Sequence, residues 1–297
     1  MTQFLQATIN GVAVGAIYAL LALGFVIIYK STQVLSFAQQ GLTVLGAFWV
    51  VYFSTVLDLN FWIALVFALA LSAAVGIGIE RVMLRPMVGK PVFSVAILTI
   101  GLNIVLLVIA FDLIGVNIRS MGDPWGLKSL SIGDLTISHK DLATIVTAAL
   151  VVGLLLAFFR YSRFGLAMRA VAADQEVALA QGVRVTRVNA AAWAIAAALA
   201  TLAGLFLGAG TGLAPAVGTR AIRALPAAVI GGLDSIAGAI VGGLLIGLIE
   251  AYMVTYQSQY LSFLGANFAN VVAWALMFLV LLVRPSGLFG TVEVERV

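Results

Sequence analysis

The sequence predicts an all-α, polytopic membrane protein, and three observations lead to this fold class. Of its 297 residues, 63% are hydrophobic and 9% are charged, whereas a soluble domain carries roughly 25% charged residues. Apolar runs of about 20 residues, the length that a helix needs to cross a bilayer, recur along the whole chain. Its thirty glycines fit closely packed membrane helices. We therefore expect a single transmembrane domain over residues 1–297, with about eight membrane-spanning helices, a broken or re-entrant segment and a cytoplasmic coupling helix.

The first half of the chain contains four expected spans. The first ends at Lys30 and includes Gly11 and Gly15, whose spacing is typical of a helix-packing face. The second begins with the polar stretch STQVLSFAQQG, for which two interpretations stay open. The stretch is either broken backbone at membrane depth, or a cytoplasmic loop that leads into an ordinary span. The four spans are expected at 10–29, 31–53, 61–79 and 92–114.

The second half contains four more expected spans and two interruptions. Residues 116–141 form a polar loop without an excess of positive or negative charge, which we place outside. Its SIGDLTIS segment alternates between polar and apolar residues like a short strand. Residues 211–234 are apolar but contain Pro215, Pro226 and a Gly-Gly pair, which predicts a second broken segment. The spans are expected at 142–159, 190–210, 236–256 and 266–283.

Basic side chains in two loops predict the orientation of the chain. The loop 81–91 and the stretch 160–189 carry the basic excess, so both are expected in the cytoplasm. The parity of the crossings then places Lys30 and the C-terminus inside and the N-terminus outside. The net charge of +4 therefore reflects orientation and does not indicate nucleic-acid binding.

The longest water-compatible run between apolar blocks is 164–188. Leu166–Gln181 is rich in strong helix formers, and Gly182 stands where a helix favours a left-handed cap. On composition alone, this helix is either a charged connector or a docking surface for a cytoplasmic partner.

Enzyme chemistry has little support in the sequence. Gly89 and Lys90 are followed by Pro91, so this is not a phosphate-binding GxxxxGK[ST] loop. The single histidine, His139, lies in the polar loop, and there is no cysteine and no metal-ligand spacing. We therefore expect no enzyme activity and no cofactor in this chain.

Ionisable residues at membrane depth are costly, which makes each of them a functional candidate. Glu250 is the deepest, followed by Asp112 and by Arg220 and Arg223 on the second broken segment. Glu250 also fits a structural role, at a span end or paired with an arginine. No proton relay is evident, so an ion-coupled secondary carrier is the weaker transport hypothesis.

Several motifs, in order along nearly the whole chain, resemble one family. They are GVAVGAIYALLALGFVIIY followed by SFAQQG, LRPMVGKP followed by LTIGLN, SRFGLAMRAVAADQEVALAQGV, ALPAAVIGGLDSIAGAIVGGLLIGLIEAY and RPSGLFG. The chain resembles the LivH-type permease subunits of bacterial branched-chain amino-acid ABC transporters. The family more usually has asparagine in place of Ser36 and a single glutamine before the glycine.

This resemblance implies an inner-membrane permease for leucine, isoleucine and valine. Its partners would be a second related permease, two cytoplasmic ATPases that bind the ATP, and a periplasmic binding protein. Other amino acids, urea or short amides remain alternative cargoes. The implied ATPase-coupling residues are Gly165, Arg169, Ala170, Asp174, Glu176, Ala178 and Gly182. The residues expected along the translocation path are Ser36, Gln39, Gln40, Asn103, Arg220, Arg223 and Glu250.

Overall fold

The structure is a computed structural model that describes residues 2–115, 118–133, 135–214, 216–260 and 268–291. It confirms the predicted all-α class. The long helices are α1 (Thr2–Thr32), α3 (Phe61–Ile79), α4 (Val92–Ile114), α5 (His139–Tyr161), α8 (Val185–Gly208) and α11 (Ile236–Tyr260). The shorter helices are α2 (Gln39–Val51), α6 (Arg163–Ala173), α7 (Gln175–Ala180), α9 (Ala216–Ala221), α10 (Ala224–Gly231) and α12 (Val272–Val283).

The expected count of about eight spans is not confirmed. Within the described residues, six helices are long and apolar enough to cross a membrane. The second expected span, 31–53, contains the 13-residue α2, and the eighth contains the 12-residue α12. The eighth was expected to start at residue 266, which lies outside the described residues, as does Pro215. The interruption predicted within 211–234 is present, because α9 and α10 are two short helices there.

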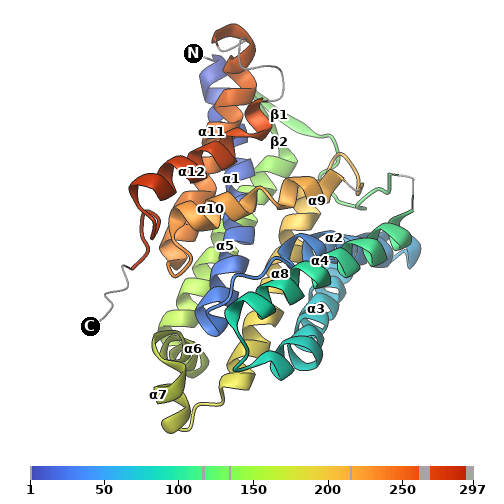
Figure 1. Cartoon of the computed structure of the whole chain (residues 1–297). Coiled ribbons are helices and arrows are strands. Elements are labelled where there is room, and N and C mark those ends of the chain that lie inside the picture. Colours follow the sequence, from blue (N-terminus) through green and yellow to red (C-terminus); the bar gives the residue numbers. More distant parts are fainter. Residues whose placement is uncertain (1, 116–117, 134, 215, 261–267, 292–297) are drawn as a thin grey trace.

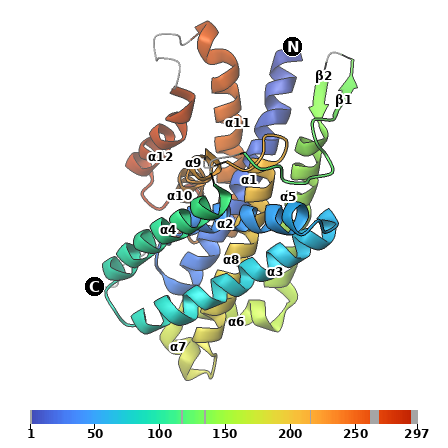
Figure 2. The ribbon, with the colours of Figure 1, turned by 90° about the vertical axis from the view of Figure 1, so that its right-hand side faces the viewer.

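α1 is the central helix of the molecule. It runs beside α5, α8 and α11, while α3 and α4 lie at a steep angle to them (Figures 1 and 2). In the most apolar window of α1, 89% of residues are buried, against 22% in α4 and 17% in α5. The outward faces of α4 and α5 are apolar, with Val108 and Leu154 more than half exposed. Such faces suit contact with lipid.

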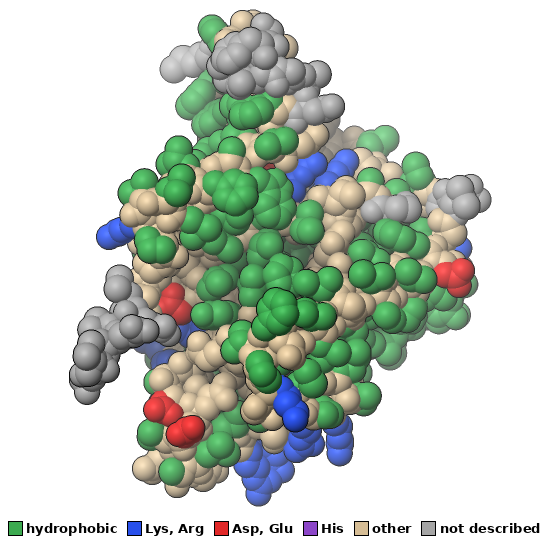
Figure 3. Space-filling view, viewed as in Figure 1, with side chains coloured by type: hydrophobic (Ala, Val, Ile, Leu, Met, Phe, Trp, Pro, Cys, Tyr) green, Lys and Arg blue, Asp and Glu red, His purple; other side chains and the backbone are tan. Residues whose placement is uncertain are grey.

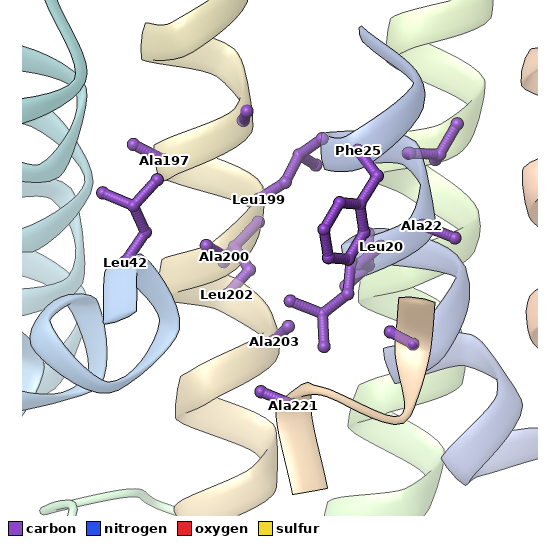
Figure 4. Packing of buried hydrophobic residues seen from close by; sticks show 14 of the residues in the cluster. Leu20, Ala22, Phe25, Leu42, Ala197, Leu199, Ala200, Leu202, Ala203 and Ala221 are labelled. Carbon is purple, nitrogen blue, oxygen red and sulfur yellow. The ribbon is translucent and has the colours of Figure 1, made fainter. Parts of the chain in front are cut away.

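Small residues let the central helices pack closely. Gly11 and Gly15 of α1 lie against α11, where a side chain on Gly15 would meet the backbone of Leu244. The predicted packing face is therefore confirmed. The alanine-rich α8 lies between α1 and α2: Figure 4 shows Leu42 of α2 on one side of it and Phe25 of α1 on the other.

The two ends of the molecule differ. The N-terminal turns of α1 contact a hairpin of β1 (Ser129–Ile132) and β2 (Leu135–Ser138), in which Ser129 pairs with Ser138. Gln6 Nε2 donates to the Thr136 carbonyl at 2.7 Å. The strand expected in SIGDLTIS is thus present as part of a hairpin, although Asp134 lies outside the described residues. The opposite end carries α6 and α7 (Figure 1).

Candidate translocation path and coupling helices

The break between α1 and α2 is buried inside the protein. α1 ends at Thr32, Gln33 has a φ of 57°, and α2 begins at Gln39. Ser36 and Gln39 are each 1% exposed. Of the two interpretations of this stretch, this low exposure favours the broken backbone, because the break is buried in protein.

Side chains of α4 support the irregular backbone of this break. Phe37 N donates to Thr99 Oγ1 at 3.1 Å, and Gly41 N donates to Asn103 Oδ1 at 2.7 Å. Asn103 Nδ2 in turn donates to Gln40 Oε1 at 3.3 Å. Non-helical backbone inside a membrane protein needs such partners, because no bulk water is available to bond it. The sequence placed Asn103 in the path but did not reveal the role of Thr99.

Gln39 extends from the start of α2 to the space between α1 and α8. Its Nε2 donates to the Ala196 carbonyl at 3.3 Å, and any side chain on Gly24 would collide with it. Its Oε1 is buried and has no hydrogen-bond partner among the described atoms. Gln39 thus presents an unpaired acceptor at the centre of the helix packing.

A second polar cluster joins α1, α11 and the junction of α9 and α10. Arg223, just before α10, forms an ion pair with Glu250 of α11. Tyr18 Oη of α1 donates to the other carboxylate oxygen, Oε2, at 2.6 Å. Glu250 is 7% exposed, so the structural pairing with an arginine that the sequence left open is what the structure shows. Tyr18 could not be found from the sequence, because it lies within a continuous apolar run.

The structure brings most of the predicted path residues into these two clusters. Gln40 of the first cluster lies beside α9, since its Nε2 lies 3.2 Å from the place that a side chain on Gly218 would take. Arg220 does not join either cluster: it is exposed, and so is Asp112. The two broken segments therefore meet at α2 and α9.

The predicted single helix over 166–181 is wrong in one respect, because it is two helices. Asp174 has extended backbone that ends α6, and its side chain caps α7 by accepting from Glu176 N at 2.8 Å and Val177 N at 2.9 Å. Asp is a favoured N-cap residue, and this local preference outweighs the helix propensity of the run. Gly182 has a φ of 81°, as the predicted left-handed cap requires.

The predicted coupling residues occupy different environments on α6 and α7. Arg169, Asp174, Glu176 and Gly182 are exposed, and Ala170 is half-buried. Gly165 and Ala178 are buried, and a side chain on Gly165 would meet the backbone of Phe158 in α5. Exposed apolar side chains accompany the charges: Leu166 is 60%, Val177 56% and Leu179 58% exposed. The pair α6–α7 therefore presents a mixed apolar and charged surface to its surroundings.

A groove of about 1350 Å³ lies beside α6 at the same end of the molecule. Its lining includes Lys30, Arg169, Asp234 and Arg284. The three basic residues, all expected on the cytoplasmic side, therefore lie at the same end of the molecule. Lys30 Nζ donates to the Asp234 carbonyl at 2.7 Å. Partial burial raises the pKa of the Asp234 carboxyl. The hydrogen bonds that Thr291 donates, together with the Asp234 backbone and the Lys30 charge, outweigh this effect and hold the pKa below its ordinary value.

Comparison with known proteins places the chain in a family. The family model described as branched-chain amino acid transport system / permease component matches residues 7–281. The chain belongs to this permease family. The permease is 35% identical to the high-affinity branched-chain amino acid transport system permease protein LivH of Escherichia coli K12, over 99% of this chain and 98% of that protein.

Two further comparisons extend this result. The permease is 32% identical to the high-affinity branched-chain amino acid transport system permease protein BraD of Pseudomonas aeruginosa, again over 99% of this chain and 98% of that protein. Its fold is similar to the solved structure of PsaBC from Streptococcus pneumoniae in complex with Fab, with a TM-score of 0.50 and 17% identity over 94% and 91% of the two chains. At 17% identity, the similarity to this solved structure shows the fold alone.

Proposed function

We propose that this permease carries leucine, isoleucine and valine across the bacterial inner membrane as a subunit of an ATP-binding cassette importer. The observation that carries the proposal is the 35% identity, over 99% of the chain, to a protein named as a branched-chain amino acid transport permease. ATP is bound and hydrolysed by partner subunits. The other partners are a second related permease and a periplasmic binding protein.

The pair α6–α7 is the proposed contact with the ATPase subunits. It carries exposed apolar side chains next to Arg169 and Glu176, a composition that suits a protein partner better than bulk water. Lys and Arg side chains gather at this end of the molecule, below a broad hydrophobic surface (Figure 3). By the positive-inside rule, this end and the C-terminus face the cytoplasm and the N-terminus faces the periplasm.

The clusters around Gln39 and Glu250 are the proposed lining of the translocation path. A buried amide acceptor without a partner, and an ion pair between the second broken segment and α11, can rearrange when the helices move. Glu250 is already paired with Arg223 and bonded to Tyr18, which disfavours the ion-coupled carrier, because such a carrier needs a carboxylate free to bind its ion.

Uptake of labelled leucine tests this function. We expect uptake in cells that contain the permease together with its partner subunits, and loss of uptake when either the permease or the ATPase is removed. Unlabelled isoleucine and valine should compete, whereas urea and short amides should not. Uptake that persists without the ATPase would contradict the importer and favour an ion-coupled carrier. Competition by urea alone would contradict the proposed cargo.

A further inference from the structure

A cavity of about 130 Å³ lies at the α6–α7 end of the permease, apart from the polar clusters around Gln39 and Glu250. It is partly open, and it is lined by the last turns of α1, the break that follows, the segment 80–90 after α3, the start of α4, α7 and α8. Its volume is close to that of an engineered cavity of about 150 Å³ that holds benzene. The cavity can therefore hold a compact apolar group about as large as benzene.

One wall of the cavity carries an unpaired carboxylate. Glu80 lines the cavity and is 4% exposed. Within the described part of the chain, it accepts no hydrogen bond and forms no ion pair; Arg81 and Arg85 act on it only through space. A buried carboxylate is costly without a partner that donates to it. The cavity thus offers a site for a positively charged group.

Two further polar atoms of the cavity wall lack partners. Asn189 and Trp193 are four residues apart on α8, so they lie on the same face of the helix, and both line the cavity. Asn189 is 7% exposed and Trp193 1% exposed. Asn189 Oδ1 and Trp193 Nε1 are both buried without a hydrogen-bond partner among the described atoms. They add one acceptor and one donor to the site.

The rest of the wall combines aliphatic side chains, the polar side chains of Thr32, Ser36, Thr99 and Gln175, and one cation. Ile28, Leu84 and Val95 contribute branched aliphatic surface, and Lys90 is an exposed lysine of the lining. Glu80 and Asn189 Oδ1 can accept from an ammonium group, while Trp193 Nε1 and Lys90 can donate to a carboxylate. An ammonium, a carboxylate and a short aliphatic side chain together describe an aliphatic α-amino acid.

We propose that this cavity binds one aliphatic α-amino acid as its zwitterion. The proposal rests on the proposed function, which makes such amino acids the cargo of the permease. The cavity also touches the coupling helices, because Gln175 of α7 lines it and donates from Nε2 to the Ser31 carbonyl at 2.9 Å. A bound amino acid therefore lies against the junction of α1 and α7, where it can report the presence of cargo to the ATPase contact.

Direct binding of labelled leucine tests the site. The probe is tritiated L-leucine, added to the assembled importer in lipid nanodiscs without the periplasmic binding protein. We expect saturable binding, and we expect Glu80→Gln to weaken it about tenfold or more, as the loss of a charge-assisted hydrogen bond implies. Asp58→Asn is the matched control, because Asp58 is an exposed carboxylate near the other end of α3.

Two leucine fragments separate the recognition of the charged groups. 3-Methylbutylamine lacks the carboxylate and 4-methylpentanoate lacks the ammonium group, so each should compete far more weakly than leucine. If the amine competes as well as leucine, no carboxylate is recognised and the zwitterion site is wrong. If the acid competes as well as leucine, Glu80 does not bind an ammonium and the site is equally wrong.

Fluorescence gives a second readout. Leucine should change the tryptophan emission of the wild-type importer, and Trp193→Phe should abolish that change while the other four tryptophans remain. Absence of saturable leucine binding, or equal affinity in Glu80→Gln with the ATPases still bound, would overturn the proposal. Leucine uptake by cells is measured separately: normal uptake alongside failed binding rejects the cavity site alone, whereas failed uptake rejects the proposed function.

Discussion

At the scale of single residues, the polar groups inside this permease divide into those with specific side-chain partners and those without any. Glu250 belongs to the first group, because one carboxylate oxygen binds Arg223 and the other accepts from Tyr18 at 2.6 Å. The side chains of Arg223 and Glu250 are 21% and 10% exposed. For a pair as buried as this one, removing one partner lowers the stability of the protein by more than the intact pair contributes to it.

Removing one member of the pair should destabilise the permease strongly. Glu250→Gln leaves the Arg223 charge without its partner, which typically costs about 3–5 kcal/mol. Arg223→Gln should cost a similar amount. The double variant should be less destabilised than the sum of the two, because neither charge then remains unpaired. Thermal unfolding of the purified permease measures this, and simple additivity would show that the ion pair does not couple α11 to the α9–α10 junction.

At the scale of elements, the sequence predicted the helical stretches more reliably than their ends. The cap at Asp174 was readable as a local signal, yet the strong helix formers on both sides concealed it. The burial of the Ser36–Gln39 break inside the protein was not readable, because the same polar residues suit a solvated loop. Only the contacts of Thr99 and Asn103, about 60 residues further along the chain, decide between the two.

The exposed apolar side chains of α7 should be needed for ATPase binding. Leu179→Asp places a charge where the proposed interface needs an apolar contact, so we expect loss of co-purifying ATPase and of leucine uptake with normal membrane insertion. Leu127→Asp is the matched control, because Leu127 is 89% exposed at the hairpin end of the molecule. Retention of the ATPase by the Leu179 variant would remove α7 from the interface.

At the scale of the whole molecule, the fold class and the order of the long helices could be predicted because hydropathy alone determines them. The candidate sites could be predicted only in part. Glu250, Arg223 and Asn103 can be found in the sequence because they are polar residues in apolar surroundings. Tyr18 and Trp193 cannot, because tyrosine and tryptophan are common within apolar stretches. Their roles depend on which helices lie together, and that is set by glycine and alanine contacts between helices distant in sequence.

The arrangement of the two ends of the molecule allows its orientation in the membrane to be tested. The hairpin and the start of α1 lie at one end, and α6, α7 and the basic loops lie at the other. Because the chain contains no cysteine, single cysteines can be introduced without a background of native thiols. Lys128→Cys and Arg184→Cys suit this purpose, since both residues are exposed, at opposite ends.

With the α6–α7 end in the cytoplasm, a maleimide that cannot cross the inner membrane should label Lys128→Cys in intact spheroplasts. It should label Arg184→Cys only after the membrane is opened. The physical reason is the basic excess at the α6–α7 end, because arginine-rich loops are retained on the cytoplasmic side. The reverse pattern would place α6 and α7 outside the cell, where no ATP is available, and would exclude them as the contact with an ATPase.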